Sequence, residues 1–215
     1  MIRVKKREDA PKELDTKGYG CDEVKKAILE DQCDKCYICE RKVTTDYQVE
    51  HLASQTNNED KVNVWDNLFI ACNYCNDKKK TSFDGIAHPD KFNVEDVITH
   101  DVDLSNEKVL FSTDSKNEDI LLTVKMLDRM FNGTHASSGR VLMESRFYNI
   151  FKMKYNHFQS VVNDYLAGNK NDMRPVIEEL VDIGSEFLAF KYHVIMQNAQ
   201  LKNDFQHLLK WNKLG

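Results

Sequence analysis

The sequence predicts an α+β fold that is mostly α-helical, and three observations support this prediction. Apolar side chains recur every three or four positions along much of the second half, as they do on the buried face of a helix. The middle of the chain is polar and is marked by two Cys-x-x-Cys pairs. Short apolar runs such as "YQVEHL" and "KVLFST" are typical of strands. We therefore expect a metal-stapled segment joined to a helical region.

Changes in composition divide the chain into four segments. They are an N-terminal arm and helix at 1–33, a cysteine-bracketed core at 34–85, a connecting segment at 86–119 and a helical region at 120–215. The first segment has one amphipathic stretch, "DEVKKAILEDQ" at 22–32, for which Asp22 is a suitable N-cap. The connecting segment is rich in Asp and Asn, which predicts loops with one or two short strands.

The helical region is predicted from its apolar stripes. A first helix covers "DILLTVKMLDRMF", a long helix covers 140–166, and "GNKND" ends it. Pro175 suits the first turn of a third helix that continues through 176–197, and a short helix follows at 203–211. The apolar side chains of the two long helices are expected in a core: Phe147, Phe151, Tyr155, Phe158, Val162, Leu166, Val176, Leu180, Ile183, Phe187 and Ile195.

The composition is that of an ordinary soluble protein, with 41% hydrophobic and 30% charged residues. The sequence has no apolar run of about 18 residues, so we expect no membrane-spanning helix. The basic start, "MIRVKKRED", lacks the apolar run of a secretory signal. We therefore expect a cytoplasmic protein whose cysteines bind metal instead of forming disulfides.

The net charge of −5 argues against tight binding of long DNA by this chain alone. Acidic residues are concentrated in the middle of the chain, and the C-terminal half is slightly basic. Basic clusters at 5–7, 41–42 and 78–80 are the local candidates for phosphate contacts. For the first cluster, a solvated surface is the simpler interpretation.

Two Cys-x-x-Cys pairs, Cys36/Cys39 and Cys72/Cys75, predict a zinc site. Each pair can form one knuckle, and two knuckles complete a tetrahedron of thiolates. Four protein ligands leave no position for water, so this zinc would be structural. It would also pin the ends of a segment too polar to form a core alone. Cys33 forms the same pattern with Cys36, which leaves open whether Cys33 or Cys39 joins the site.

The cysteine-bracketed core resembles the HNH endonucleases of the ββα-metal type. The resemblance covers 36–80 and depends on the order Cys-x-x-Cys, Glu-His, Asn-Leu, Cys-x-x-Cys-Asn and lysines. Outside the cysteines, the matching positions are Glu50, His51, Asn67, Asn76 and Lys79. The resemblance implies a zinc-stapled ββα core that hydrolyses phosphodiester bonds of nucleic acid, with DNA favoured over RNA.

The residues suit this chemistry, which needs a base to activate water and a cation to neutralise phosphate charge. His51 is the predicted base, because imidazole titrates near neutral pH. The resemblance implies that Glu50 and Asn76 hold catalytic Mg²⁺ or Mn²⁺, and their oxygen atoms suit such ions. Adjacent strand residues face opposite sides, so the strand must end or bend between Glu50 and His51 if both are to reach the phosphate.

The remaining matching residues have implied supporting roles. Asn67 would hold the loop and orient the backbone of His51, and whether it is catalytic or purely structural stays open. Lys78, Lys79 and Lys80 are expected to bind nucleic-acid phosphates, with a solvated helix face as the competing interpretation. The family more often has Asp at position 50, and some branches have His at position 76. These two departures affect where the catalytic cation would sit.

Three longer stretches narrow the resemblance: "MIRVKKREDAPKEL", "VEHL…WDNLFIACNYCN" and "LLTVKMLDRMFNGTHASSGR". They are similar to the PtuB-type HNH subunits of Septu anti-phage systems, which are also associated with some retrons. This implies an ABC-type ATPase partner, PtuA, and a helical region that serves as the docking surface. Two alternatives stay open. One is a stand-alone restriction or homing HNH nuclease, and the other is a non-catalytic zinc module that binds nucleic acid or protein.

Overall fold

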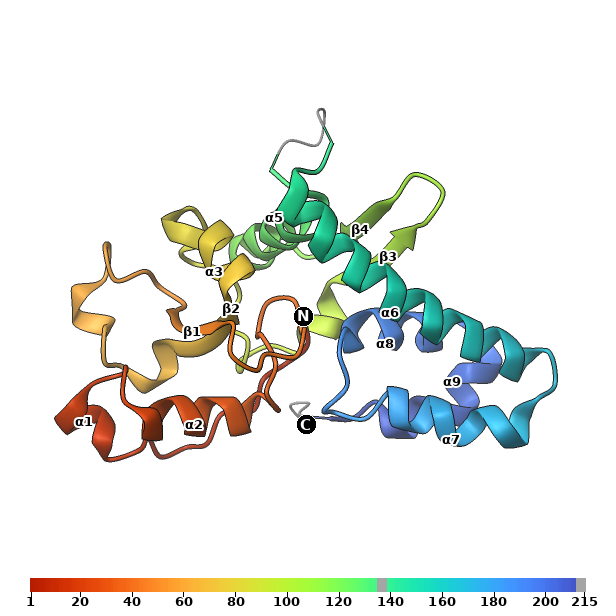
Figure 1. The fold of residues 1–215 in the computed structure, drawn as a ribbon, viewed down its shortest axis with the longest axis horizontal. Helices are drawn as coiled ribbons and strands as arrows, with labels where there is room; N and C mark the ends of the chain where they lie inside the picture. Colours follow the sequence, from red (N-terminus) through yellow and green to blue (C-terminus); the bar gives the residue numbers. More distant parts are fainter. Residues whose placement is uncertain (135–138, 212–215) are drawn as a thin grey trace.

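The computed structural model describes residues 1–134 and 139–211. Helices outweigh strands, and the strands form two small antiparallel hairpins, which confirms the predicted mixture of helix and sheet. Figure 1 shows two groups of elements bridged by one long helix, α6 (Leu142–Leu166). One group contains the first hairpin and the N-terminal helices. The other contains the C-terminal helices.

The elements before α6 alternate between short helices and hairpins. They are α1 (Glu13–Lys17), α2 (Asp22–Asp31), β1 (Tyr47–His51), β2 (Leu68–Cys72), α3 (Asn73–Lys79), α4 (Val94–Val97), β3 (Thr99–Asp103), β4 (Lys108–Ser112) and α5 (Glu118–Asn132). The α2 helix agrees with the predicted one, although Cys21 and not Asp22 is its N-cap residue. The connecting segment holds the β3–β4 hairpin where short strands were predicted. Asn117 caps α5 by accepting hydrogen bonds from two backbone N–H groups.

The β1–β2 hairpin and α3 follow one another in a β-β-α order. The strands pair antiparallel with Glu50 opposite Phe69 and His51 opposite Leu68. All five residues of β2 are buried within the main apolar cluster, and β1 pairs with one edge of the strand while Gln32 covers the other at Ile70. The Gln32 side chain binds both the N–H and the C=O of Ile70, at 2.8 and 2.9 Å. No polar backbone group of Ile70 is therefore left unpaired at the outer edge.

Apolar packing ties this hairpin to the helices that follow. Phe69 and Trp65 belong to the same cluster of buried side chains as Phe131 of α5 and Phe151 of α6. The aromatic rings of Phe131 and Phe151 lie edge to face at 5.2 Å, a favourable arrangement for aromatic pairs. A second cluster joins the C-terminal half of α6 to the helices after it, through Phe158, Val161, Val162, Tyr165, Ile177, Val181, Tyr192, Ile195, Leu201, Phe205 and Leu209.

The C-terminal helices differ from the prediction in their boundaries. They are α7 (Lys170–Leu180), α8 (Leu188–Gln197) and α9 (Ala199–Phe205). The single helix predicted at 176–197 is wrong, because the chain leaves the helix after Leu180 and re-enters it at Leu188. Pro175 lies inside α7 and not in the first turn of a helix. The predicted last helix at 203–211 begins earlier, and Leu166 is 37% exposed instead of buried.

The break at 181–187 has a physical cause in contacts with the cysteine-bracketed core. The buried ammonium of Lys35 donates to the backbone oxygens of Ile183 and Ser185, at 2.6 and 2.9 Å. The Glu40 carboxylate accepts from the N–H groups of Leu188 and Ala189 at the start of α8. These contacts satisfy backbone groups that a continuous helix would have paired internally, so they favour two helices over one.

Candidate metal centre and histidine groove

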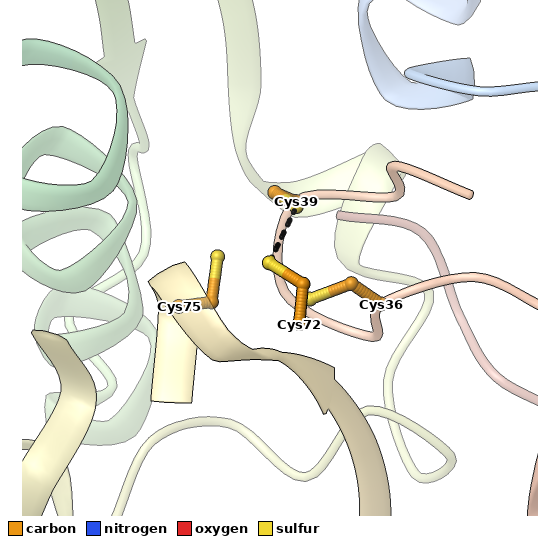
Figure 2. A group of neighbouring side chains, drawn as sticks. All are labelled: Cys36, Cys39, Cys72 and Cys75. Atoms are coloured by element: carbon orange, nitrogen blue, oxygen red, sulfur yellow. Dashed lines mark hydrogen bonds between the residues drawn. The ribbon is translucent and has the colours of Figure 1, made fainter. Parts of the chain in front are cut away.

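The four predicted cysteines lie together in the structure. The sulfur atoms of Cys36, Cys39, Cys72 and Cys75 are all within 4.8 Å of one another, and all four residues are buried. Figure 2 shows the side chains converging from two separate segments, with the Cys39 and Cys72 sulfurs 3.9 Å apart. Among residues 1–134 and 139–211, these four cysteines form the one group of His, Cys, Asp or Glu side chains whose ligand atoms lie close enough together to hold a metal ion.

Local geometry explains why each pair turns its sulfurs inward. The first pair lies in a tight turn, in which the N–H of Glu40 donates to the oxygen of Cys36 and the N–H of Cys36 donates to the oxygen of Arg41, both at 2.9 Å. Glu40 completes this turn with a φ of 63°. The second pair spans the junction of β2 and α3, since Cys72 ends the strand and Cys75 lies in the first helical turn.

Cys39, and not Cys33, completes the group of four. Cys33 follows α2 in a left-handed turn conformation with a φ of 53°, and it is only partly buried. Cys21 and Cys33 are both free thiols outside the group. The choice that the Cys-x-x-Cys spacing left open is therefore decided by the fold.

The donor set fits zinc, because four thiolates with no open position form a structural site. Hydrogen bonds from the thiols of Cys36, Cys39 and Cys75 hold the pKa of Cys72 well below its usual range. Burial disfavours the charge of the Arg41 guanidinium, but the neighbouring Cys72 sulfur and Asp46 raise its pKa overall. Arg41 therefore remains a cation beside the thiolates and offsets part of their negative charge.

A groove of about 570 Å³ lies beside the hairpin and collects several of the predicted site residues. Its walls come from β1, the loop after it, the region of α3 and the N-terminal arm. The lining residues are Tyr19, Gln48, Val49, Glu50, His51, Ser54, Gln55, Thr56, Asn76, Lys80 and Thr81. The structure therefore brings Glu50, His51, Asn76 and Lys80 to one polar cavity, whereas it places Asn67, Lys78 and Lys79 outside its lining.

Both ring nitrogens of His51, the last residue of β1, form hydrogen bonds. Its Nε2 donates to the carbonyl oxygen of Val62 at 2.9 Å, because a carbonyl can only accept. Its Nδ1 then carries the lone pair and accepts from the Gln55 amide at 3.0 Å. The ring of Tyr19 lies edge to face at 4.7 Å. Burial lowers the pKa of His51, which favours the neutral imidazole that a general base requires.

Glu50 is buried and both of its carboxylate oxygens are used. Oε1 lies 3.0 Å from the ammonium of Lys79, and Oε2 accepts from the Tyr37 hydroxyl at 2.7 Å. Tyr37 lies inside the first Cys-x-x-Cys pair, so the metal centre and Glu50 are joined by one side chain. Burial raises the pKa of Glu50, while Lys79 and Tyr37 act in the opposite direction.

The two asparagines have different surroundings. Asn67 is buried, and its amide binds the backbone of Ala53 in both directions and the oxygen of Lys61. These contacts close the loop between β1 and β2 and give both the oxygen and the nitrogen of the Asn67 amide a partner. Asn76 is half-buried on the groove wall, where its amide nitrogen donates to Gln48 at 2.8 Å.

The three lysines of the 78–80 cluster do not form one phosphate-binding face. Lys80 is exposed at the groove. Lys78 binds Glu144 at the start of α6 and the Thr134 hydroxyl. Lys79 has no exposed surface, so the expectation that it faces phosphates does not hold. Its ammonium is directed into the protein by Glu50 and by backbone oxygens at the end of β1.

Sequence reasoning missed three residues that shape this site. Tyr19 and Gln55 contact the His51 ring, and Tyr37 binds Glu50. The position of Tyr37 between two zinc ligands was the one available signal. Tyr19 comes from the loop between α1 and α2, and no local pattern links it to a histidine far along the chain.

The basic cluster at 5–7 also has partners inside the protein. Lys6 lies over the Trp65 ring at 4.0 Å and donates to the oxygens of Trp65 and Leu68. Burial lowers the pKa of Lys6 to about 8. Arg7 pairs with Glu30 and Asp31 of α2. This cluster therefore fastens the N-terminal arm to the hairpin.

Comparison with protein-family models, curated proteins and solved structures found no match to this chain. In the part of the chain that the structure describes, no helix combines the length and the apolar character needed to cross a membrane.

Proposed function

We propose that this protein is an HNH-type endonuclease in which His51 is the general base. The observation that carries the proposal is the setting of His51 at the end of β1, on the wall of a polar groove. The Val62 oxygen fixes the tautomer, so Nδ1 carries the lone pair, which would take a proton from water once the Gln55 amide that now donates to it is displaced. The β-β-α order and the four converging cysteines support the same assignment.

The roles of the remaining residues follow from their contacts. Zinc held by Cys36, Cys39, Cys72 and Cys75 keeps the hairpin and α3 together, which fixes the position of the groove. Asn67 keeps the loop after His51 closed through its bonds to Ala53, and it has a structural role. Asn76 and Lys80 line the groove where a phosphate would lie.

Glu50 does not fit a catalytic divalent cation in this arrangement. Its two oxygens already bind Lys79 and Tyr37, and a second cation near Lys79 would be repelled. Asn76 offers one amide oxygen, and an amide alone is a poor site for Mg²⁺ or Mn²⁺. We therefore assign no step of the reaction to a cation at Glu50.

We further propose a Septu-type setting for this nuclease, with nucleic acid as the substrate and DNA favoured over RNA. The net charge of −5 supports delivery to nucleic acid by a partner such as an ABC-type ATPase of the PtuA kind. Co-purification of an ATPase with the chain from its own cells tests this part. A chain that cuts purified DNA efficiently while alone would favour the stand-alone nuclease.

The central test compares His51→Ala with His157→Ala, a change at an exposed histidine of α6. Plasmid DNA is incubated with each protein, alone and with the candidate ATPase, in the presence of Mg²⁺ or Mn²⁺. We expect His51→Ala to abolish cleavage while the protein keeps its zinc and still unfolds cooperatively, at a lower melting temperature because the buried ring and its hydrogen bonds are lost. If His51→Ala instead unfolds the protein, or if cleavage persists in it, the non-catalytic zinc module becomes the better assignment.

A further inference from the structure

Lys79 is the most unusual charged residue of the site, because its side chain is completely buried. An ammonium has three N–H donors, and three acceptors surround this one. They are Oε1 of Glu50 at 3.0 Å, the oxygen of Leu52 at 2.8 Å and the oxygen of His51 at 3.1 Å. A carboxylate oxygen of Asp84 lies 4.0 Å away. Every donor therefore has a partner, as a buried charge requires.

Two of these partners are consecutive backbone oxygens, which has a geometric consequence. In a regular strand, successive carbonyl groups point to opposite edges of the sheet. One ammonium can bind the oxygens of both His51 and Leu52 only if the backbone turns at this point. The chain does leave the strand here, and the next N–H groups, those of Leu52 and Ala53, bind the backbone and side-chain oxygens of Asn67.

The two side chains before this turn point in different directions, because Glu50 and His51 are consecutive residues of β1 and alternate between its faces. The Glu50 carboxylate points inward to Lys79 and Tyr37. The His51 ring points to the groove, where Val62 and Gln55 hold its nitrogens. Lys79 contacts the carboxylate of the first residue and the backbone oxygen of the second, so one side chain fixes both directions.

We propose that Lys79 is a positioning residue that fixes the backbone at His51 and Leu52, with Glu50 as its counter-ion. Lys79 lies at the end of α3, whose first turn carries Cys75. The zinc centre, through α3 and Lys79, thus determines where the imidazole sits. This inference rests on the proposed function only for its catalytic consequence, because the placement of the ring can be measured without any cleavage.

The test uses a pair of variants, because Lys79→Met alone leaves Glu50 buried without its ion pair. Glu50→Gln is the reference, since glutamine keeps an oxygen that can accept from Lys79 and Tyr37. Glu50→Gln/Lys79→Met removes the ammonium as well, without leaving an unpaired charge. Lys78→Met changes a neighbouring lysine of α3 that contacts Glu144 instead of β1. Zinc content and melting temperature confirm that each variant is folded.

The readout is the pair of imidazole ¹⁵N resonances of His51, assigned by their absence in His51→Gln. Glu50→Gln and Lys78→Met should keep the resonances of one fixed tautomer. In Glu50→Gln/Lys79→Met both should move toward the average of two tautomers, because the ring no longer faces the Val62 oxygen in one orientation. Unchanged resonances in the folded double variant would overturn the proposal.

If the wild-type protein cleaves nucleic acid, steady-state kinetics provide a second test of the proposal. Relative to Glu50→Gln, the variant Glu50→Gln/Lys79→Met should have a kcat about 100-fold lower, the usual scale for a displaced catalytic group, and a KM within about twofold. A parallel rise in KM with unchanged kcat would overturn the positioning role. If wild type cleaves no nucleic acid, the proposed function fails, and the imidazole resonances still decide the role of Lys79.

Discussion

The cysteine-bracketed core and the C-terminal helices α7–α9 are stabilised in different ways. The core buries polar and charged groups, among them Glu50, His51, Asn67 and Lys79, and pairs each with a specific partner. The C-terminal helices bury Ile177, Ile195, Leu201 and other apolar side chains against the end of α6. Loss of one partner in the core leaves an unsatisfied group, whereas loss of one methyl group in the helices leaves a small cavity.

The two regions therefore differ in how strongly each depends on single interactions. The polar core depends on four converging cysteines and on defined pairs, so it can hold an imidazole in one orientation. The apolar region tolerates small changes, because its stabilisation is spread over many contacts. Four predictions test this contrast, from the largest expected effect to the smallest.

Removal of a zinc ligand should have the largest effect and should act on the core. Cys72→Ser should lose bound zinc and the cooperative unfolding of the core, since structural zinc binding contributes about 10–16 kcal/mol in small zinc domains. Part of the helical signal should remain, because α6–α9 share their own apolar cluster. Zinc analysis and circular dichroism during heating measure both. Cys33→Ser, outside the group of four, should behave as wild type; equal loss of zinc in both variants would contradict the assigned ligands.

Breaking the buried ion pair should have the next largest effect. Lys79→Met should lower the free energy of unfolding by about 3–5 kcal/mol, because Glu50 is left charged and unpaired in the interior. Glu50→Gln/Lys79→Met should recover much of this loss, since it removes both charges. The coupling free energy between Glu50 and Lys79 is measured by urea unfolding of four proteins: the wild type, the two single variants and the double variant. Strictly additive losses would show that the two side chains do not interact.

Acidification should weaken the protein through His100 of β3, which is buried against α8. Its ring packs against Phe190 of α8, and its Nδ1 contacts the Ile98 oxygen. Burial, the chain's amino group and His193 lower the pKa of His100 well below 6.5. Below about pH 6.5 the unfolded chain takes up a proton that the folded chain does not, so the free energy of unfolding falls by up to about 1.4 kcal/mol per pH unit.

Urea unfolding between pH 7 and pH 5 measures this slope. His100→Gln should reduce the slope, because it removes one group that the folded protein keeps neutral. His157→Gln is the matched control, since the side chain of His157 is exposed in both states and should leave the slope unchanged. An identical pH dependence in wild type and His100→Gln would assign the effect to other groups.

Removal of one buried methyl group from the C-terminal helices should have the smallest effect. Ile195 is fully buried in the second apolar cluster, so Ile195→Val should cost about 0.5–1.5 kcal/mol. Zinc content should be unchanged. Ile150→Val provides the same chemical change at a position that is 38% exposed, and we expect almost no loss there. Comparable losses at both positions would show that burial does not govern this region.

Much of this architecture could be predicted from local patterns. The spacing of the cysteines predicted the cluster that could hold a metal and left only the choice between Cys33 and Cys39 open, because a tetrahedral site constrains spacing within each pair. The apolar repeat identified α6 nearly to its ends. The adjacency of Glu50 and His51 predicted that only one of the two side chains faces the interior of the protein, and the Glu50 carboxylate does point inward while His51 lines the groove; the strand does not end or bend between them. In each case the deciding residues lie within a few positions of one another.

The sequence by itself determined three of the four clustered cysteines, the helical stripe of α6 and the residue type of the candidate base. The tertiary structure alone decided that Lys79 turns inward to Glu50, that Gln55 and Tyr19 meet the His51 ring, and that the chain breaks between α7 and α8. The physical reason is the separation along the sequence over which each kind of interaction acts. Periodicity and ligand spacing act over a few residues, whereas the partner of a buried charge or of an unpaired backbone group can come from anywhere in the chain.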